Sequence, residues 1–435
     1  MEGDSGGGVR VLSRRIVRPL TPPPPPPTKC NGSHHQPSNK EETEVPPLTP
    51  PAAMANGDGG CHRLLNKEED VEVIHLTPWD LRLISIDYIQ KGILLPKPPS
   101  SGAALVNALA SSLARALARF YSFAGRLAAD EREDGTLTLS VRCTGDGAEF
   151  VHAVAPDVTV ADIVSSLYIP KVVWAFYPLR EVLGADAALA EPSSIPLVAV
   201  QHIVRRFDRT TVQECFFTFS AASVKKLKAR ANAEMMMAAA AGETSPIISS
   251  LQAVLAHLWR AVCRARLLAP EQPTFYSVVV GCRGRVAGIP PGYVGNAMVF
   301  ARADATAGEV ERNGLGWTAW LLNRAVASFD EQGMRESLVK WVGEPDFAYM
   351  DKLSSRGTAL VTGSSPRFDV FGNDFGWGKP VAVRSGSGNK ADGKATVYEG
   401  PERGGSVSLE VCIAPDALAR LVVDQEFMEA VSAPA

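Results

Sequence analysis

Six consecutive prolines, Pro22–Pro27, constrain this 435-residue chain more than any other feature of its sequence. Proline fixes φ and lacks an N–H, so such a run enters neither a helix nor a central strand and adopts polyproline II. Gly, Ser, Asn and more Pro follow, up to the charged run Lys67–Asp70. Residues 20–70 cannot bury enough apolar area to offset their ordering entropy, so we expect a disordered insertion. A Pro-rich ligand for a recognition domain is the alternative.

The insertion divides a short N-terminal segment from the rest of the chain. Residues 1–19 contain a β-branched stretch, residues 9–19, that predicts a strand. Folded sequence resumes at Val71, and the chain length suits two or three domains.

Composition excludes several classes of protein. The net charge of -3 argues against a nucleic-acid partner, because backbone binding needs a clear Lys/Arg excess. No run of about 18 apolar residues exists, so we expect no membrane span. The seven cysteines include no CxxC pair. This predicts free thiols in a reducing, cytoplasmic setting and no metal site.

Hydrophobic periodicity predicts a mixture of helices and strands. Apolar residues at helical spacing indicate helices over residues 105–121, 249–268 and 306–329. Alternation around Val381, Val397 and residues 407–413 predicts strands, which we expect to form an antiparallel meander. Helices and strands follow no strict βαβ rhythm, so the predicted class is mixed α/β.

Several common catalytic motifs are absent. The chain contains no GxSxG, no P-loop and no HExxH. What stands out is Asp374-Phe375-Gly376-Trp377-Gly378, where two glycines flank a tryptophan and permit a tight backbone path. The plainest interpretation is a structured turn with an aromatic plug, which is compatible with a role in organising a site.

Seven blocks spread over residues 71–430 resemble one family. They are Thr77–Asp80, Tyr88–Gly92, Phe120–Leu127, Pro196–Gln201, Gly281–Arg285, Gly292–Asn296 and Asp374–Gly378. Together they resemble the plant BAHD acyl-CoA-dependent acyltransferases, whose DFGWG signature residues 374–378 match without change.

The resemblance implies two similar-sized domains, each with a mixed sheet and helices, and a channel between them. We expect an N-terminal domain over residues 71–235 and a C-terminal domain over 243–435. The implied reaction transfers an acyl group from an acyl-CoA co-substrate to an alcohol or amine, in a monomer without a tightly bound cofactor. It also implies that Asp374 is structural and pairs with Arg283 or Arg285.

The family's catalytic motif, HxxxD, is missing. In the family its His is the general base and its Asp orients the ring. The seven histidines are His34, His35, His62, His75, His152, His202 and His257, and none has Asp four residues later. After Gln201 the chain passes through residues 202–211 directly into what resembles a later strand, so the first domain is predicted to be truncated internally.

No catalytic residue is therefore assigned. His202 is a weak substitute because Asp208 lies six residues away instead of four, and an incidental surface His is the favoured interpretation. We interpret His152 as a strand residue, His75 as part of a structural segment and His257 as a surface or packing residue. We expect an inactive or impaired acyltransferase. The alternatives are a non-catalytic relative that binds a ligand or partner, or the product of a truncated splice form or gene prediction.

Overall fold

The computed structural model describes residues 8–20, 71–99, 102–131, 137–177, 211–238, 246–289, 293–353, 357–363 and 365–432. The insertion predicted for residues 20–70 lies outside them, apart from Leu20. The chain forms two compact units. The larger unit contains Met1–Val11, Thr77–Pro99 and Ala153–Ala435, and the smaller contains Leu12–Leu76 and Ser100–His152.

The smaller unit combines two small sheets with one long helix. Its elements are β1 (Arg10–Val17), β2 (Val73–His75), α2 (Ala103–Arg119), the 3-10 helix η1 (Tyr121–Ala124), β4 (Arg126–Glu131), β5 (Leu137–Arg142) and β6 (Ala148–Val154). β1 pairs with β6, and β5 lies between β2 and β4. The predicted strand within residues 9–19 and the predicted helix at 105–121 are thus confirmed as β1 and α2. α2 packs small side chains, among them Ala110 and Ala114, into a core with Val17 and Ala124.

The larger unit contains most of the regular structure. Its elements are α1 (Pro78–Leu81), β3 (Lys91–Leu94), α3 (Val160–Val164), α4 (Val172–Ala175), β7 (Gln213–Phe219), α7 (Ala221–Ala238), α8 (Ser250–Ala265), β8 (Pro273–Gly281), β9 (Met298–Thr306), α9 (Ala307–Arg312), α10 (Gly314–Ala327), α11 (Glu331–Gly343), α12 (Met350–Leu353), β10 (Ala359–Thr362), β11 (Ala382–Ser385), β12 (Lys394–Glu399), β13 (Val407–Ile413), α13 (Pro415–Leu421) and α14 (Gln425–Met428).

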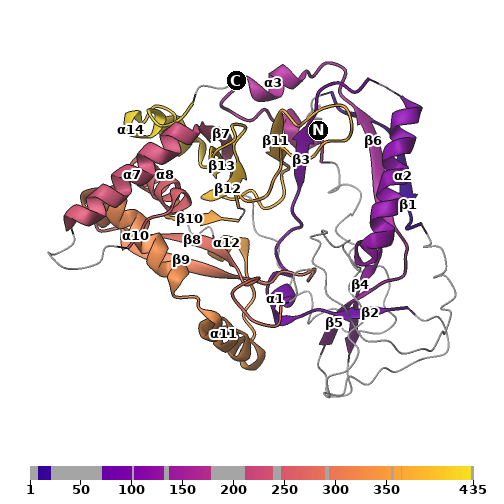
Figure 1. Ribbon diagram of the computed structural model, residues 1–435, viewed down its shortest axis with the longest axis horizontal. Coiled ribbons are helices and arrows are strands. Elements are labelled where there is room, and N and C mark those ends of the chain that lie inside the picture. Colours follow the sequence, from indigo (N-terminus) through magenta and orange to yellow (C-terminus); the bar gives the residue numbers. More distant parts are fainter. Residues whose placement is uncertain are drawn as a thin grey trace, which may run out of the picture. The chain divides into compact units, whose positions relative to one another are not determined.

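Its centre is a six-stranded sheet in the order β7-β13-β12-β10-β8-β9. β10 runs parallel to both β12 and β8, whereas the remaining neighbours are antiparallel. Helices α7, α8 and α10 cover one face (Figure 1), and together with α13 they share a single apolar core with the strands. The mixed α/β class predicted from the sequence is confirmed.

The central helix of that core is α8, where the sequence predicted a helix. Ser249 caps its first turn by accepting a hydrogen bond from the backbone N–H of Gln252 (3.3 Å), whose side chain accepts from Ser249 N in return. Trp259 is fully buried and packs edge-on against Tyr276 of β8, with ring centroids 5.8 Å apart. The amphipathic pattern thus fixes which face of α8 meets the sheet.

The single helix expected over residues 306–329 is instead two helices, α9 and α10. The break falls at Gly314, which has φ +80° and therefore cannot continue an α-helix. A glycine in the left-handed region ends one helix and lets the next begin at a new angle.

The expected meander over residues 381–413 is only half correct. β12 and β13 are antiparallel neighbours, as predicted. β11 pairs instead with β3, with Ala382 opposite Leu94 and Ser385 opposite Lys91. The sequence could not show this because the partner strand lies almost 300 residues away.

The compact units divide the chain elsewhere than the expected boundary between residues 235 and 243. β7 and α7 contribute Phe217, Phe219 and Val224 to the same core as α8. The domain ranges 71–235 and 243–435 therefore remain predictions from the resemblance. Within the described residues no helix is long and apolar enough to cross a membrane, and all five described cysteines are free thiols.

Candidate functional site

The DFGWG segment forms a self-contained turn. Asp374 Oδ1 accepts hydrogen bonds from the backbone N–H groups of Gly376 (2.8 Å) and Gly378 (3.3 Å). Those glycines have φ of +97° and +125°, so side chains there would strain the backbone. The Phe375 and Trp377 rings lie 5.7 Å apart. The structured turn is therefore confirmed, but Phe375 is exposed and does not fill an interior space.

The expected pairing of Asp374 with Arg283 or Arg285 is not formed. Asp374 is exposed, and it makes no ion pair with any residue in the described part of the chain. Arg283 donates instead to the carbonyl oxygens of Tyr293 (2.9 Å) and Gly295 (2.6 Å), and Arg285 is exposed. The expected ion pair is therefore wrong, because Asp374 Oδ1 accepts hydrogen bonds from its own turn.

Two other sequence blocks do meet. Asp80 caps α1 together with Thr77, and its Oδ1 accepts from the backbone N–H of Asn296 (2.8 Å). The Thr77 hydroxyl lies 3.1 Å from the hydroxyl of Tyr293. The Thr77–Asp80 block therefore anchors the loop that contains Tyr293 and Asn296, a contact that sequence reasoning did not anticipate.

Several buried charged side chains lie on the other face of the central sheet, away from the helices. Because strand side chains alternate, Cys215 and Phe217 of β7 enter the helix-covered core while Glu214 points to the opposite face. Residues that are opposite each other in neighbouring strands, or two apart in one strand, have their side chains on the same face. In the β12–β13 ladder Lys394 is opposite Cys412 and Glu410 is opposite Thr396, so Lys394 and Glu410 lie on one face. Buried charge on a sheet face marks either an ion-pair network or a functional interior.

Lys390 is the hub of this face. Its Nζ donates to Glu214 Oε2 (2.5 Å), to Ser385 Oγ (2.9 Å) and to Glu410 Oε1. The Ser385 backbone N–H also donates to Glu410 Oε2 (3.2 Å). We call Glu214, Ser385, Lys390 and Glu410 the Lys390 cluster. All four are buried, and they join β7, β11, β13 and the β11–β12 connection.

Burial and charge oppose each other within the Lys390 cluster. Burial favours neutral carboxyls and raises the pKa of Glu214, although Lys390 opposes the shift. For Glu410 burial acts in the same direction, but Lys390 and Ser385 outweigh it and lower the pKa. Burial would lower the pKa of Lys390, yet Glu410 and Glu214 raise it. The cluster thus holds a charged lysine against an ionised Glu410.

Arg384, Tyr177 and Gln90 hold the segments around the Lys390 cluster. Arg384 lies over the Phe216 ring, 4.3 Å from its centroid, and donates to the carbonyl oxygen of Ile163 (3.0 Å). The Tyr177 hydroxyl donates to the Arg384 carbonyl oxygen (2.9 Å). Gln90 Oε1 accepts from the backbone N–H of Gly388 (2.8 Å), which ties the loop before Lys390 to the segment before β3.

The described histidines lie elsewhere. His75 is in β2 and His152 in β6, as expected for structural positions. Of the two interpretations of His257, the packing residue is confirmed: His257 is fully buried in α8 and stacks on Phe427, with centroids 5.3 Å apart. His202, like His34, His35 and His62, falls outside the described residues. None of the described histidines touches the Lys390 cluster.

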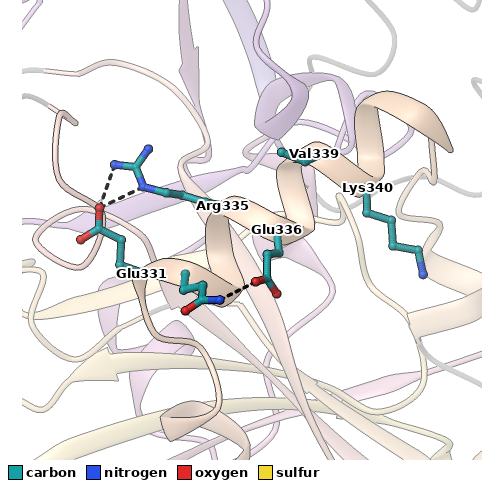
Figure 2. Close-up of a pocket in the computed structure, with 6 residues that line it drawn as sticks. Glu331, Arg335, Glu336, Val339 and Lys340 are labelled. Atoms are coloured by element: carbon teal, nitrogen blue, oxygen red, sulfur yellow. Dashed lines mark hydrogen bonds and ion pairs between the residues drawn. The ribbon is translucent and has the colours of Figure 1, made fainter.

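A shallow pocket lies along the outer face of α11 (Figure 2). Its lining comes from that one helix. Arg335 pairs with Glu331 (2.7 Å), and Gln332 donates to Glu336 (2.8 Å), both one helical turn apart. Because these polar groups satisfy one another and none converges from a second element, the pocket is not the candidate site. The described residues also contain no cluster of His, Cys, Asp and Glu suited to a metal ion.

Comparison with known proteins gives the family. A profile described as the Transferase family matches residues 66–204 and 204–428. An uncharacterized acetyltransferase of Arabidopsis thaliana is 31% identical over 428 residues, covering 81% of this chain and 93% of the relative. The chain belongs to the Transferase family, the BAHD acyltransferases. Another Arabidopsis member, BAHD acyltransferase DCR, is 33% identical over 217 residues, covering 49% of this chain and 43% of that protein.

Solved structures support the same fold for this BAHD-family chain. TRI101 of F. sporotrichioides, complexed with coenzyme A and T-2, has a TM-score of 0.59 at 17% identity and covers 83% of this chain and 99% of its own. Vinorine synthase has a TM-score of 0.57 at 16% identity, with coverages of 98% and 99%. At these identities the likeness concerns the fold alone.

The 428-residue alignment with the Arabidopsis acetyltransferase also indicates that residues of the relative have no counterpart in this chain. It runs over 428 residues yet covers only 81% of a 435-residue chain, so it includes positions that the relative has and this chain lacks. By contrast, the 217-residue alignment with BAHD acyltransferase DCR covers 49% of the chain. Its length and the number of residues covered are almost equal, so it includes almost no positions that this chain lacks. The profile match also divides at residue 204.

Proposed function

We propose that this chain is built for BAHD-type acyl transfer, from an acyl-CoA thioester to a hydroxyl or amine acceptor, and that as it stands it is inactive or impaired. The family match carries the first half of the proposal. The second half rests on the sequence, in which no His is followed by Asp at the fourth position. A positioned general base is typically worth about 10²–10⁴ in rate, so its loss leaves at most residual catalysis.

The break in the alignments supports a missing segment. The profile divides at residue 204, inside the 202–211 stretch where the sequence predicts the truncation. The family's general base would belong to that segment. Among the described histidines, His257 is buried and stacked on Phe427, whereas His75 and His152 lie in β2 and β6, which supports the absence of a histidine base from this part of the chain.

Acyl-CoA as donor is supported by the neighbours and by the intact second half of the chain. TRI101 was solved with coenzyme A, and residues 204–428 match the family profile in one piece. We therefore expect thioester binding to outlast the loss of turnover. We also propose a cytoplasmic monomer, in line with the five free thiols in the described part of the chain.

The test compares this chain with a version that carries an HxxxD-bearing segment of a relative, inserted at residue 204. Thiol release is followed with a panel of acyl-CoA donors, with and without alcohol and amine acceptors. We expect acceptor-dependent release only from the restored chain. Acceptor-dependent release by the short chain, abolished by His202→Ala, would show that His202 is the base and would overturn the proposal.

Sequencing the transcript across the Gln201–Val212 junction separates the alternatives. A read-through encoding HxxxD identifies the short chain as a truncated splice form or gene prediction. A transcript that matches the short chain leaves a non-catalytic binding relative as the alternative, which equilibrium binding of acyl-CoA without turnover would support.

A further inference from the structure

The turn that follows α2 exposes its large apolar side chains. Within Phe120–Leu127 the fully buried residue is the small Ala124, which anchors the turn in a core with Val17. The large apolar side chains of the turn are each more than one-third exposed, and we call them the apolar turn: Phe120, Tyr121, Phe123 and Leu127. Apolar side chains that gather on a surface mark a site of interaction.

The apolar turn continues onto the neighbouring three-stranded sheet. Leu127 of β4 is opposite Val141 of β5, and Val141 is opposite Ile74 of β2. Residues opposite one another have their side chains on one face of the sheet. Leu127 is 64% exposed and Ile74 is 36% exposed. The exposed apolar surface therefore extends from the turn across three strands.

Arginines flank the apolar turn. Arg119 ends α2 directly before it, Arg126 lies within it, and both are exposed. Arg126 is also directly opposite Arg142 in the β4–β5 ladder. Like charges in that position repel, and here only the exposed carboxylates of Asp146 (3.8 Å) and Asp130 (2.7 Å) offset them among the described residues. An anion bound beside the turn would relieve the same repulsion.

A third exposed arginine, Arg18, follows β1 and lies close to the turn. Gly147 connects the two segments: its N–H donates to Ala124 O (3.1 Å), and a Cβ built on it would lie 2.3 Å from Val17 O. The described part of the smaller unit contains seven arginines and five carboxylate side chains. Its charge is therefore positive, whereas the whole chain has a net charge of -3.

We propose that the smaller unit docks on an anionic lipid surface through the apolar turn and its arginines. Phe and Leu side chains enter the boundary between headgroups and acyl chains, and a guanidinium binds phosphate oxygens through paired hydrogen bonds. The cytoplasmic leaflet supplies the negative charge. A second copy fits less well, because pairing this surface with itself would bring arginines together. The inference does not rest on the proposed acyl transfer.

The test mixes the purified full chain with vesicles of phosphatidylcholine, alone or with about a third of phosphatidylserine, and measures co-sedimentation. We expect binding to the mixed vesicles at low salt. Binding should be at least about tenfold weaker without phosphatidylserine, and likewise at about 0.5 M salt, because salt screens exposed charges. Equal binding to both kinds of vesicle, or binding to neither, overturns the inference without any variant.

Two pairs of variants locate the surface. Phe123→Ser should weaken binding about fivefold or more, whereas Phe368→Ser, which removes an equally exposed ring outside the smaller unit, should not. Arg18→Gln should weaken binding about fivefold and Arg285→Gln should leave it unchanged. Melting temperatures verify that the variants are folded.

Equal binding by the two members of each pair would assign lipid binding to another surface and overturn the inference. Sedimentation velocity of the unmodified chain without lipid tests the competing occupant. A dimer that Phe123→Ser dissociates would show that a second copy covers the apolar turn, which also overturns the inference. A chain that stays monomeric without lipid and sediments with the mixed vesicles supports it.

Discussion

At the scale of single residues, the Lys390 cluster shows why a buried charge must be paired. Removing the lysine leaves Glu214 and Glu410 buried without their shared donor. We expect Lys390→Met to lower the free energy of unfolding by about 3–5 kcal/mol at pH 7. The loss of stability should be smaller at pH 5, because in the variant the two buried carboxyl groups become protonated and uncharged. Chemical denaturation at both pH values measures it.

Lys379→Met is the matched control, because it removes the same charge from an exposed side chain. Its free energy of unfolding should stay within about 0.5 kcal/mol of the unmodified chain. The double variant Lys390→Met/Glu214→Gln should be more stable than Lys390→Met alone. Equal stability of all four proteins would contradict the assignment of Lys390 as the hub.

His257 provides a prediction about pH. Burial lowers its pKa to about 4, so the folded chain resists protonation at this site while the unfolded chain accepts a proton near pH 6.5. The unfolded state therefore binds more protons between those values, and stability is lost as pH falls from 6.5 to 4. The loss amounts to about 3 kcal/mol.

Denaturant titrations between pH 7 and pH 4.5 check this. His257→Gln should flatten the decline in that window, even if it is less stable throughout. His75→Gln, at an exposed position in β2, should keep the decline of the unmodified chain. If His257→Gln declines as steeply as the unmodified chain, another group causes the acid sensitivity.

The residue scale is also where the sequence was least informative about the site. The aromatic turn at Asp374–Gly378 could be predicted because its glycines and Asp are adjacent. The Lys390 cluster could not, since Glu214 and Lys390 are 176 residues apart and meet only through strand pairing. Nor could the sequence show that Asp374 bonds its own turn instead of Arg283.

At the scale of helices and strands, Gly316 marks a close approach of α10 to α7. A Cβ there would lie 2.6 Å from the carbonyl oxygen of Ala231 and 2.9 Å from Glu234 Cβ. We expect Gly316→Ala to lower the free energy of unfolding by about 1–3 kcal/mol, because the α7 backbone cannot yield as a flexible side chain would.

Gly343→Ala is the control, since Gly343 lies at the end of α11 with nothing within 4 Å of an added Cβ. Its melting temperature should be unchanged or slightly raised, because alanine favours the helix over glycine. A Gly316→Ala variant as stable as Gly343→Ala would show that the two helices separate at little cost.

The hydrophobic pattern predicted where helices and strands lie better than it predicted which strands pair. Periodicity located the start of α8 to within one residue and its end to within three. Alternation identified β12 and β13. Pairing of β11 with β3 and the split at Gly314 depend on tertiary contact and on a single φ value, which periodicity does not encode.

At the scale of the whole molecule, the sequence predicted the mixed α/β class and the BAHD family, because signature blocks are spread along the chain. It did not predict that β7 would join the large sheet, since that depends on seven paired residues with β13. The division into a smaller and a larger unit near residue 153 likewise reflects packing.

The last prediction concerns what the segment that we propose to be missing would do for stability. Within the described residues, β3 and β11 form a sheet of only two strands. Two strands alone are marginally stable in water, so their hydrogen bonds should open more readily than those of the six-stranded sheet. We expect that inserting a relative's segment at residue 204 slows amide exchange in β3 and β11. The same should hold for the N–H of Val381, just before β11, which donates to Leu94 O (2.7 Å).

Hydrogen exchange with mass spectrometry on the short and restored chains makes the comparison. The β12–β13 ladder is the internal reference, and its exchange should be the same in both chains. If β3 and β11 already exchange as slowly as β12 and β13 in the short chain, the truncation has cost this region nothing. The loss of turnover that we propose would then be a loss of chemistry alone, with the fold of the larger unit unaffected.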